Sequence, residues 1–214
     1  MIKFHNRTEA GKMLAQSLIA YANYQDLLVL ALPRGGVPVA FEVAKFLNAP
    51  LDVCIVRKLG VPGNKELAMG AIAFGDIGVL NYDVINTLRI DQEIINTVAS
   101  EELEELKRRD FRYRGDAPPI NINNKTVILI DDGIATGSTI SAAITLIKQQ
   151  QPTKLILAIP IAPATTLENL KLVVDEIVCL QTPEVMSAIG LWYEDFSQTT
   201  DEEVSKLLNS FKII

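Results

Sequence analysis

The chain has 214 residues, 49% of them hydrophobic and 21% charged, which is typical of a folded globular protein and excludes a disordered one. A chain of this length buries enough apolar surface on folding to need neither disulfides nor a structural metal. Its net charge of -6 argues against a protein that grips nucleic-acid phosphates through a basic surface.

The small number of histidine and cysteine residues limits the kinds of catalytic and metal site that the chain can form. Histidine occurs once, as His5, which argues against a Ser-His-Asp triad and excludes a histidine-rich zinc site. Cys54 and Cys179 lie in apolar runs, so we expect two buried, unreactive thiols in a reducing compartment. We find neither a signal-peptide stretch nor an apolar run of membrane-spanning length, and we expect a cytoplasmic protein with no membrane partner.

The first third of the chain alternates helical and strand patterns. Apolar residues recur at helical spacing over residues 7–22, with Asn6 as a candidate N-cap. A short apolar run predicts a strand over residues 27–32, and a Pro-Arg-Gly-Gly turn separates it from a helix over residues 37–47. A second strand is predicted over residues 51–56.

An insertion over residues 57–120 interrupts this alternation. Its Gly- and Pro-rich part, residues 59–78, is expected to be irregular, and a long helix is predicted over residues 91–109. The basic end of that helix comprises Lys107, Arg108, Arg109, Arg112 and Arg114. We interpret these cations as side chains that the helix dipole favours at a solvated C-terminus, with an anion or a neighbouring subunit as the alternative partner.

The remaining chain returns to apolar strands. Strands are predicted over residues 126–130, 155–161 and 176–180, with a helix over residues 139–149 after the first of them. Continuous apolar strands that alternate with helices are typical of parallel sheets covered on both sides. The pattern therefore predicts an α/β fold with an open parallel five-stranded sheet and helices on both faces.

The turn after residues 126–130 is the segment most informative about chemistry. Asp131 and Asp132 follow the strand directly, at the sheet edge where open α/β folds bind ligands. Two adjacent ionised carboxylates can accept hydrogen bonds from the two hydroxyls of a diol such as ribose. A helix then begins within Thr136, Gly137, Ser138 and Thr139. Free N–H groups, hydroxyls and the positive end of the helix dipole suit a phosphate dianion there.

Residues 127–139 resemble the phosphoribosyl pyrophosphate motif of type I phosphoribosyltransferases, in which two acids precede a Thr-Gly-x-Thr loop. The resemblance implies that Asp131 and Asp132 bind the ribose hydroxyls. It also implies that the 5-phosphate is held by Ala135, Thr136, Gly137, Ser138 and Thr139. Gly133 departs from the motif, because a larger residue is usual at that position.

Two further segments extend the resemblance. The turn Pro33-Arg34-Gly35-Gly36 resembles the family's pyrophosphate loop, which assigns Arg34, Gly35 and Gly36 to the leaving group. Residues 57–63 resemble the segment that leads into the family's mobile catalytic loop. The resemblance thereby implies a flexible insertion whose catalytic cations, which neutralise the departing pyrophosphate, are Arg57, Lys58 and Lys65.

The resemblance also divides the chain into a core, residues 1–181, and a C-terminal hood, residues 182–214, which closes over the acceptor base. Trp192 and Tyr193 lie in this hood. Their rings suit either stacking on a planar base or packing of the hood onto the core, and we keep both interpretations.

These features together imply a phosphoribosyltransferase, a glycosyltransferase enzyme that moves the 5-phosphoribosyl group to a nitrogenous, purine-like base and releases pyrophosphate. Magnesium is expected to bind through the donor, with no metal ligand from the protein. Ala135 stands where 6-oxopurine enzymes usually carry an aspartate, which disfavours an acceptor of that kind. The expected partners are these small molecules, without nucleic acid, and the resemblance leaves room for a homodimer.

Two rival functions remain for comparison. A regulatory protein could keep the same pocket to sense phosphoribosyl pyrophosphate without efficient transfer, but the loop cations favour an enzyme. A haloacid-type phosphotransferase would use Asp131 as nucleophile in a DxDx[TV] order, and the DDGIAT sequence here does not fit that order.

Overall fold

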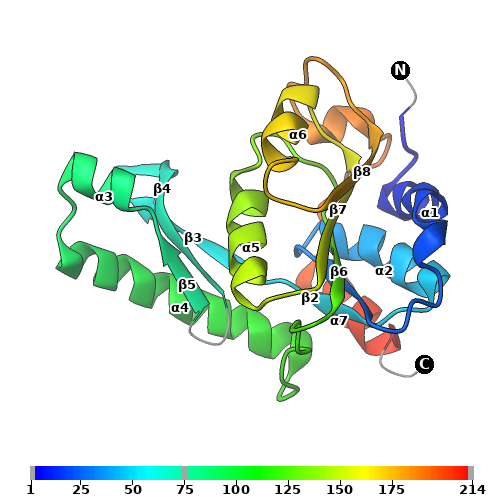
Figure 1. The fold of residues 1–214 in the computed structure, drawn as a ribbon, viewed down its shortest axis with the longest axis horizontal. Coiled ribbons are helices and arrows are strands. Elements are labelled where there is room, and N and C mark those ends of the chain that lie inside the picture. Colours follow the sequence, from blue (N-terminus) through cyan, green and yellow to red (C-terminus); the bar gives the residue numbers. More distant parts are fainter. Residues whose placement is uncertain (1–2, 74–76, 212–214) are drawn as a thin grey trace.

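The computed structural model describes residues 3–73 and 77–211 (Figure 1). Its main sheet has five parallel strands in the order β2-β1-β6-β7-β8. The predicted open parallel sheet is therefore confirmed. Its strands are β1 (Leu27–Ala31), β2 (Leu51–Val53), β6 (Thr126–Ile130), β7 (Lys154–Ile161) and β8 (Glu176–Gln181).

Helices cover both faces of this sheet (Figure 1). Side chains alternate along each strand, so Val29 and Ala31 join one hydrophobic cluster while Leu28 and Leu30 join the other. The first cluster is completed by α1 (Arg7–Ser17), α2 (Gly36–Leu47) and α7 (Asp201–Phe211). The second is completed by α5 (Ser138–Gln149) and α6 (Ala164–Leu170).

The first helix ends earlier than its pattern predicts. It stops at Ser17, and a short 3-10 helix, η1 (Ile19–Tyr21), follows it. Asn6 caps α1 as expected, because its side chain accepts a hydrogen bond from the backbone N–H of Glu9 at 3.0 Å. None of the described helices is both long and apolar enough to cross a bilayer.

The insertion forms an ordered arm that extends away from the main sheet (Figure 1). The expectation of an irregular segment over residues 59–78 is wrong, because most of it forms a three-stranded antiparallel sheet; residues 74–76 lie outside the described ranges. Gly63, with φ +83°, makes the turn between the first two strands. The arm consists of β3 (Val56–Val61), β4 (Asn64–Ala73), β5 (Ile77–Leu80), α3 (Tyr82–Leu88) and α4 (Gln92–Arg114).

The strand predicted over residues 51–56 is two strands in different sheets. β2 ends at Val53, where it pairs with β1, and β3 begins at Val56 and pairs with β4. Ile55 at this crossing belongs to one cluster of the main sheet, and Cys54 and Val56 pack against the other, which explains the apolar run. The arm also has a small hydrophobic cluster of its own. That cluster contains Leu59, Val61, Met69, Ile85 and Ile95.

Helix α4 is longer than predicted and joins the arm to the core. Leu106 and Tyr113, both buried, belong to the core cluster beneath the main sheet. The cations at its basic end pair with acids of this chain, which include Glu104, Glu105, Glu202, Asp52 and Asp110. These side chains therefore serve contacts within the chain.

Arg114 is the most buried of these cations, with 7% of its side chain exposed. Its Nε donates to Asp52 Oδ1 at 2.9 Å, and its Nη1 pairs with Asp110. Asp52 also accepts from the backbone N–H of Ile120 at 3.0 Å. This cluster therefore fastens the end of α4 to β2 and to the chain that returns to the core.

Replacing Arg114 by alanine leaves two buried carboxylates without their cation. We expect Arg114→Ala to lower the free energy of unfolding by about 3–5 kcal/mol in urea titrations. Lys107→Ala removes the same charge from the same helix at an exposed pair and is expected to change the midpoint little. Equal midpoints for the two variants would contradict the structural role of Arg114.

Candidate functional site

Two loops meet where β1 and β6 end side by side in the main sheet. Ala31 pairs with Ile130, and the backbone N–H of Leu32 donates to the carbonyl of Ile130 at 2.9 Å. A Cβ atom added to Gly35 would lie 2.0 Å from Oδ2 of Asp132, and one added to Gly36 would lie 2.8 Å from the carbonyl oxygen of Ile130. Only glycine fits at both positions, so the two segments assigned to one ligand are in contact.

The acid pair has an internal cation that sequence analysis missed. Arg7 Nε donates to Asp132 Oδ2 at 2.7 Å, and both side chains are 11% exposed. The Arg7 guanidinium also lies 3.9 Å from the ring centroid of Phe196 and donates to the carbonyl of Ser197 at 2.7 Å. No local signal marks Arg7, because its pattern is that of a first-turn residue in an amphipathic helix.

Burial dominates the electrostatics of the two acids. It raises the pKa of Asp131 well above the ordinary value, and the charge of Asp132 raises it further. Burial also raises the pKa of Asp132, although Arg7 partly offsets this effect. The backbone N–H of Asp132 donates to Asp131 Oδ1 at 2.9 Å, which orients that carboxyl group. Perturbed carboxyl groups of this kind are common at functional sites.

The phosphate loop predicted from the sequence, residues 135–139, runs into the start of α5, which has no side-chain cap. Gly137, with φ +78°, is the N-cap of α5 and has no side chain to occupy the first-turn N–H groups. Thr136, Ser138 and Thr139 are exposed around it. The carbonyl of Ala135 accepts from Thr166 Oγ1 at 3.0 Å, which fixes the loop to α6. The geometry can accept an anion at the positive end of the helix dipole.

Gly133 departs from the family motif for a packing reason. A Cβ atom at this position would lie 2.6 Å from Cγ2 of Ile189 and 3.0 Å from Cγ2 of Ile161. Ile189 belongs to η2 (Ile189–Trp192), near the C-terminal side of the sheet. Glycine therefore lets the C-terminal segment pack directly on the motif.

The three predicted catalytic cations lie in different surroundings. Lys58, on β3, directs Nζ to the hydroxyl of Ser138 at 3.2 Å and so reaches the phosphate loop. Arg57 points instead to the arm helix, where its Nε donates to Glu102 Oε2 at 2.6 Å. Lys65 is exposed on β4, next to the β3–β4 turn. The structure thus brings one of the three to the phosphate loop.

The hood residues Trp192 and Tyr193 are core residues, with 6% and 3% of their surface exposed. The Tyr193 ring lies between Phe4 and Phe196, at centroid distances of 5.3 and 5.0 Å. Its hydroxyl donates to the backbone carbonyl of Asp132 at 2.6 Å. The packing interpretation therefore describes these two rings, and the stacking interpretation does not.

The two cysteines are half-buried, and not fully buried as expected. Burial raises the pKa of Cys54 to about 12 and that of Cys179 to about 11, and both are free cysteines. His5 is exposed, with Nδ1 2.8 Å from Oε2 of Glu194. The exposed position of His5 agrees with the expectation of a surface residue.

Comparison with known proteins gives a consistent result. A family model described as "Phosphoribosyl transferase domain" matches residues 3–190. Curated relatives from two strains of Mycobacterium tuberculosis, each named "Putative phosphoribosyl transferase", are 45% identical over 206 residues. The match covers 96% of this chain and 46% of each relative, so the chain spans about half the length of the curated relatives it matches.

Two solved structures share the fold. TT1426 from Thermus thermophilus is 38% identical with a TM-score of 0.88, covering 98% of this chain and 99% of that one. AQ2163 from Aquifex aeolicus is 15% identical with a TM-score of 0.54, covering 86% and 78%, and is similar in fold alone. With the family model matching most of its length and the predicted loops in contact, the chain belongs to the phosphoribosyltransferase family.

Proposed function

We propose that this protein transfers the 5-phosphoribosyl group of phosphoribosyl pyrophosphate to a nitrogenous, purine-like base and releases pyrophosphate. The single observation that carries the proposal is the contact between the two loops at the ends of β1 and β6. Asp132 Oδ2 fills the space beside Gly35, 2.0 Å from where a Cβ would lie, so the backbone of the Arg34 loop lies directly against the acids suited to a ribose.

The proposal gives each loop one part of the donor. Asp131 and Asp132 accept hydrogen bonds from the ribose hydroxyls, and Ala135 through Thr139 hold the 5-phosphate at the start of α5. Arg34 and the amide of Gly35 face the diphosphate, while the backbone N–H of Gly36 donates to the carbonyl of Leu32 at 3.1 Å and shapes the turn. The Lys58 ammonium group, 3.2 Å from Ser138 Oγ, lies on the phosphate side of the site.

The proposed reaction is a displacement at the anomeric carbon of the ribose. The bond from that carbon to the pyrophosphate oxygen breaks, a bond to a base nitrogen forms with inversion, and the electron pair leaves with pyrophosphate. Catalysis then depends mainly on cations and amides that stabilise the negative charge gathering on the leaving group. Arg57 and Lys65 would contribute when the arm closes and excludes water.

In this proposal magnesium binds together with phosphoribosyl pyrophosphate. When bound to the ribose and pyrophosphate oxygens, it would neutralise part of the leaving-group charge. Among the described residues there is no group of three or more His, Cys, Asp or Glu side chains that could hold a metal ion. The proposal assigns no protein ligand to the ion.

The acceptor site is assigned to the hood, residues 182–214, packed on a core of residues 1–181. Ala135 is exposed and has no carboxylate to offer a 6-oxopurine, so we infer an acceptor outside that class. The free thiols of Cys54 and Cys179 fit the cytoplasmic location that the sequence predicts.

One observation favours a second candidate, a regulatory protein that senses phosphoribosyl pyrophosphate. Arg57 is paired with Glu102 of the arm through Nε at 2.6 Å, so a predicted catalytic cation is engaged away from the phosphate loop. A sensor needs to bind the donor but need not stabilise a leaving group.

Pyrophosphate release distinguishes the two candidates. The protein is incubated with magnesium, phosphoribosyl pyrophosphate and a panel of bases, and released pyrophosphate is measured. We expect release with at least one base that lacks the 6-oxo group. Tight donor binding without release for any base would favour the sensor, and no donor binding would contradict both.

Neutralising either acid should weaken donor binding. We expect Asp131→Asn and Asp132→Asn each to raise the donor dissociation constant about tenfold or more in calorimetric titrations, because each loses hydrogen bonds to a charged acceptor. Their stabilities should differ, since only Asp132→Asn leaves the buried Arg7 guanidinium without its counter-charge. Unchanged donor affinity in both variants would remove the assigned role.

The raised pKa of Asp131 has a consequence for stability that can be measured. The folded state holds the Asp131 proton more tightly than the unfolded state, so ionisation costs stability as the pH rises from the ordinary value of 3.8 through the raised value. We therefore expect the free Asp131→Asn protein to melt higher than wild type near neutral pH. The difference should shrink on acidification, and a difference that grows instead would contradict the assignment.

A further inference from the structure

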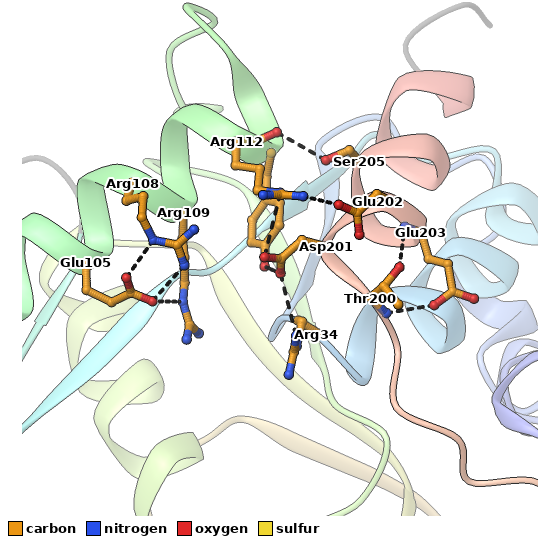
Figure 2. A network of polar contacts seen from close by, with 11 residues as sticks. Arg34, Glu105, Arg108, Arg109, Arg112, Thr200, Asp201, Glu202, Glu203 and Ser205 are labelled. Carbon is orange, nitrogen blue, oxygen red and sulfur yellow. Dashed lines mark hydrogen bonds and ion pairs between the residues drawn. The ribbon is translucent and has the colours of Figure 1, made fainter.

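The loop that we assign to the pyrophosphate carries an arginine with a carboxylate beside it. Arg34 Nη1 lies 3.9 Å from Oδ1 of Asp201, the first residue of α7 (Figure 2). The Arg34 side chain is 36% exposed. At this separation the contact is an ion pair without a hydrogen bond, and Arg34 can exchange it for another anion at little cost.

Asp201 itself is held from a second direction. The hydroxyl of Tyr113 donates to Asp201 Oδ1 at 2.6 Å, and Arg112 Nε lies 3.6 Å from Oδ2. Tyr113 is buried near the end of α4, so the carboxylate is anchored to the arm as well as to α7. The Tyr113 hydrogen bond also holds the pKa of Asp201 below its ordinary value.

Helix capping does not account for the position of Asp201. Thr200 and Glu203 cap the start of α7 reciprocally (Figure 2), because Thr200 N donates to Glu203 Oε2 at 2.7 Å and Glu203 N donates to Thr200 Oγ1 at 3.1 Å. Asp201, Glu202 and Glu203 all place negative charge in the first turn, near the positive end of the helix dipole, but the dipole does not select the partners of the Asp201 carboxylate. The contacts that direct Asp201 are therefore those with α4 and with the pyrophosphate loop.

We propose that Asp201 is a counter-charge for Arg34 that competes with the pyrophosphate group and so favours release of pyrophosphate. The inference rests on the proposed function of the Arg34 loop. An arriving diphosphate takes the guanidinium from Asp201, and the fixed carboxylate repels the anion and takes Arg34 back when the product leaves. Asp201 acts through Arg34, so it is a positioning residue and not a catalytic one.

Calorimetric titration of the full chain with inorganic pyrophosphate tests this role. An asparagine at position 201 keeps an oxygen that can accept from Tyr113, so Asp201→Asn removes the charge and little else. We expect it to bind pyrophosphate more tightly than wild type, by a factor on the order of three to ten, with a smaller gain at high salt. Ribose 5-phosphate, assigned to the loop at the start of α5, should bind both proteins equally.

Glu202→Gln is the matched control. It removes the same charge from the same helical turn, but Glu202 is 74% exposed and pairs with Arg112. Its pyrophosphate affinity should equal that of wild type. A second control introduces Asp201→Asn into an Arg34→Gln background, where the gain in affinity should disappear because the two residues are coupled.

The outcomes separate this inference from the function on which it rests. Unchanged or weaker pyrophosphate binding by Asp201→Asn would overturn it, as would an equal gain in Glu202→Gln, a gain that persists without Arg34, or a parallel gain for ribose 5-phosphate. If the wild-type protein binds neither pyrophosphate nor ribose 5-phosphate, both the proposed function and the role of Asp201 are wrong. If ribose 5-phosphate binds but Asp201→Asn has the same pyrophosphate dissociation constant as wild type, only the role of Asp201 is wrong.

Discussion

The close approach of two backbones at the end of adjacent parallel strands governs the rest of this structure. β1 and β6 end together, and the loop after β1 lies so near the acids after β6 that side chains at positions 35 and 36 would overlap them. Both loops must therefore be built from small residues on this side, and the acids must sit in a partly closed space. Burial then raises the pKa of both acids, which is the electrostatic cost of the arrangement.

Charged side chains from distant parts of the chain reach the loops at the strand ends. Arg7 comes from the first helix, Lys58 from the arm and Asp201 from the last helix, and each contacts one of the loops at the strand ends. Such contacts make the site depend on segments that are not part of any local motif. They also connect the arm and the C-terminal helix to the proposed pyrophosphate loop, since Tyr113 of α4 and Arg34 share the Asp201 carboxylate.

The differences between expectation and structure have a common physical origin. Residues 59–78 carry glycines and prolines that suggest irregular chain, yet hydrogen bonding between β3, β4 and β5 and a separate hydrophobic cluster order them. From sequence alone, Trp192 and Tyr193 of the hood could either stack on a base or pack against the core. In the structure Tyr193 packs between Phe4 and Phe196, as the packing interpretation predicts, because apolar rings are stabilised by burial.

The sequence by itself determined the parallel sheet and the position of the acids and glycines after β6, because hydrophobic period and glycine placement are local properties, and the resemblance of residues 127–139 to a known motif indicated the family. It also located the Pro-Arg-Gly-Gly turn after β1. Only the tertiary structure decided that Arg7 neutralises Asp132, that Gly133 makes room for Ile189, and that Asp201 faces Arg34. Those contacts join residues far apart in the chain, and their partners are selected by packing of whole elements, which no local pattern records.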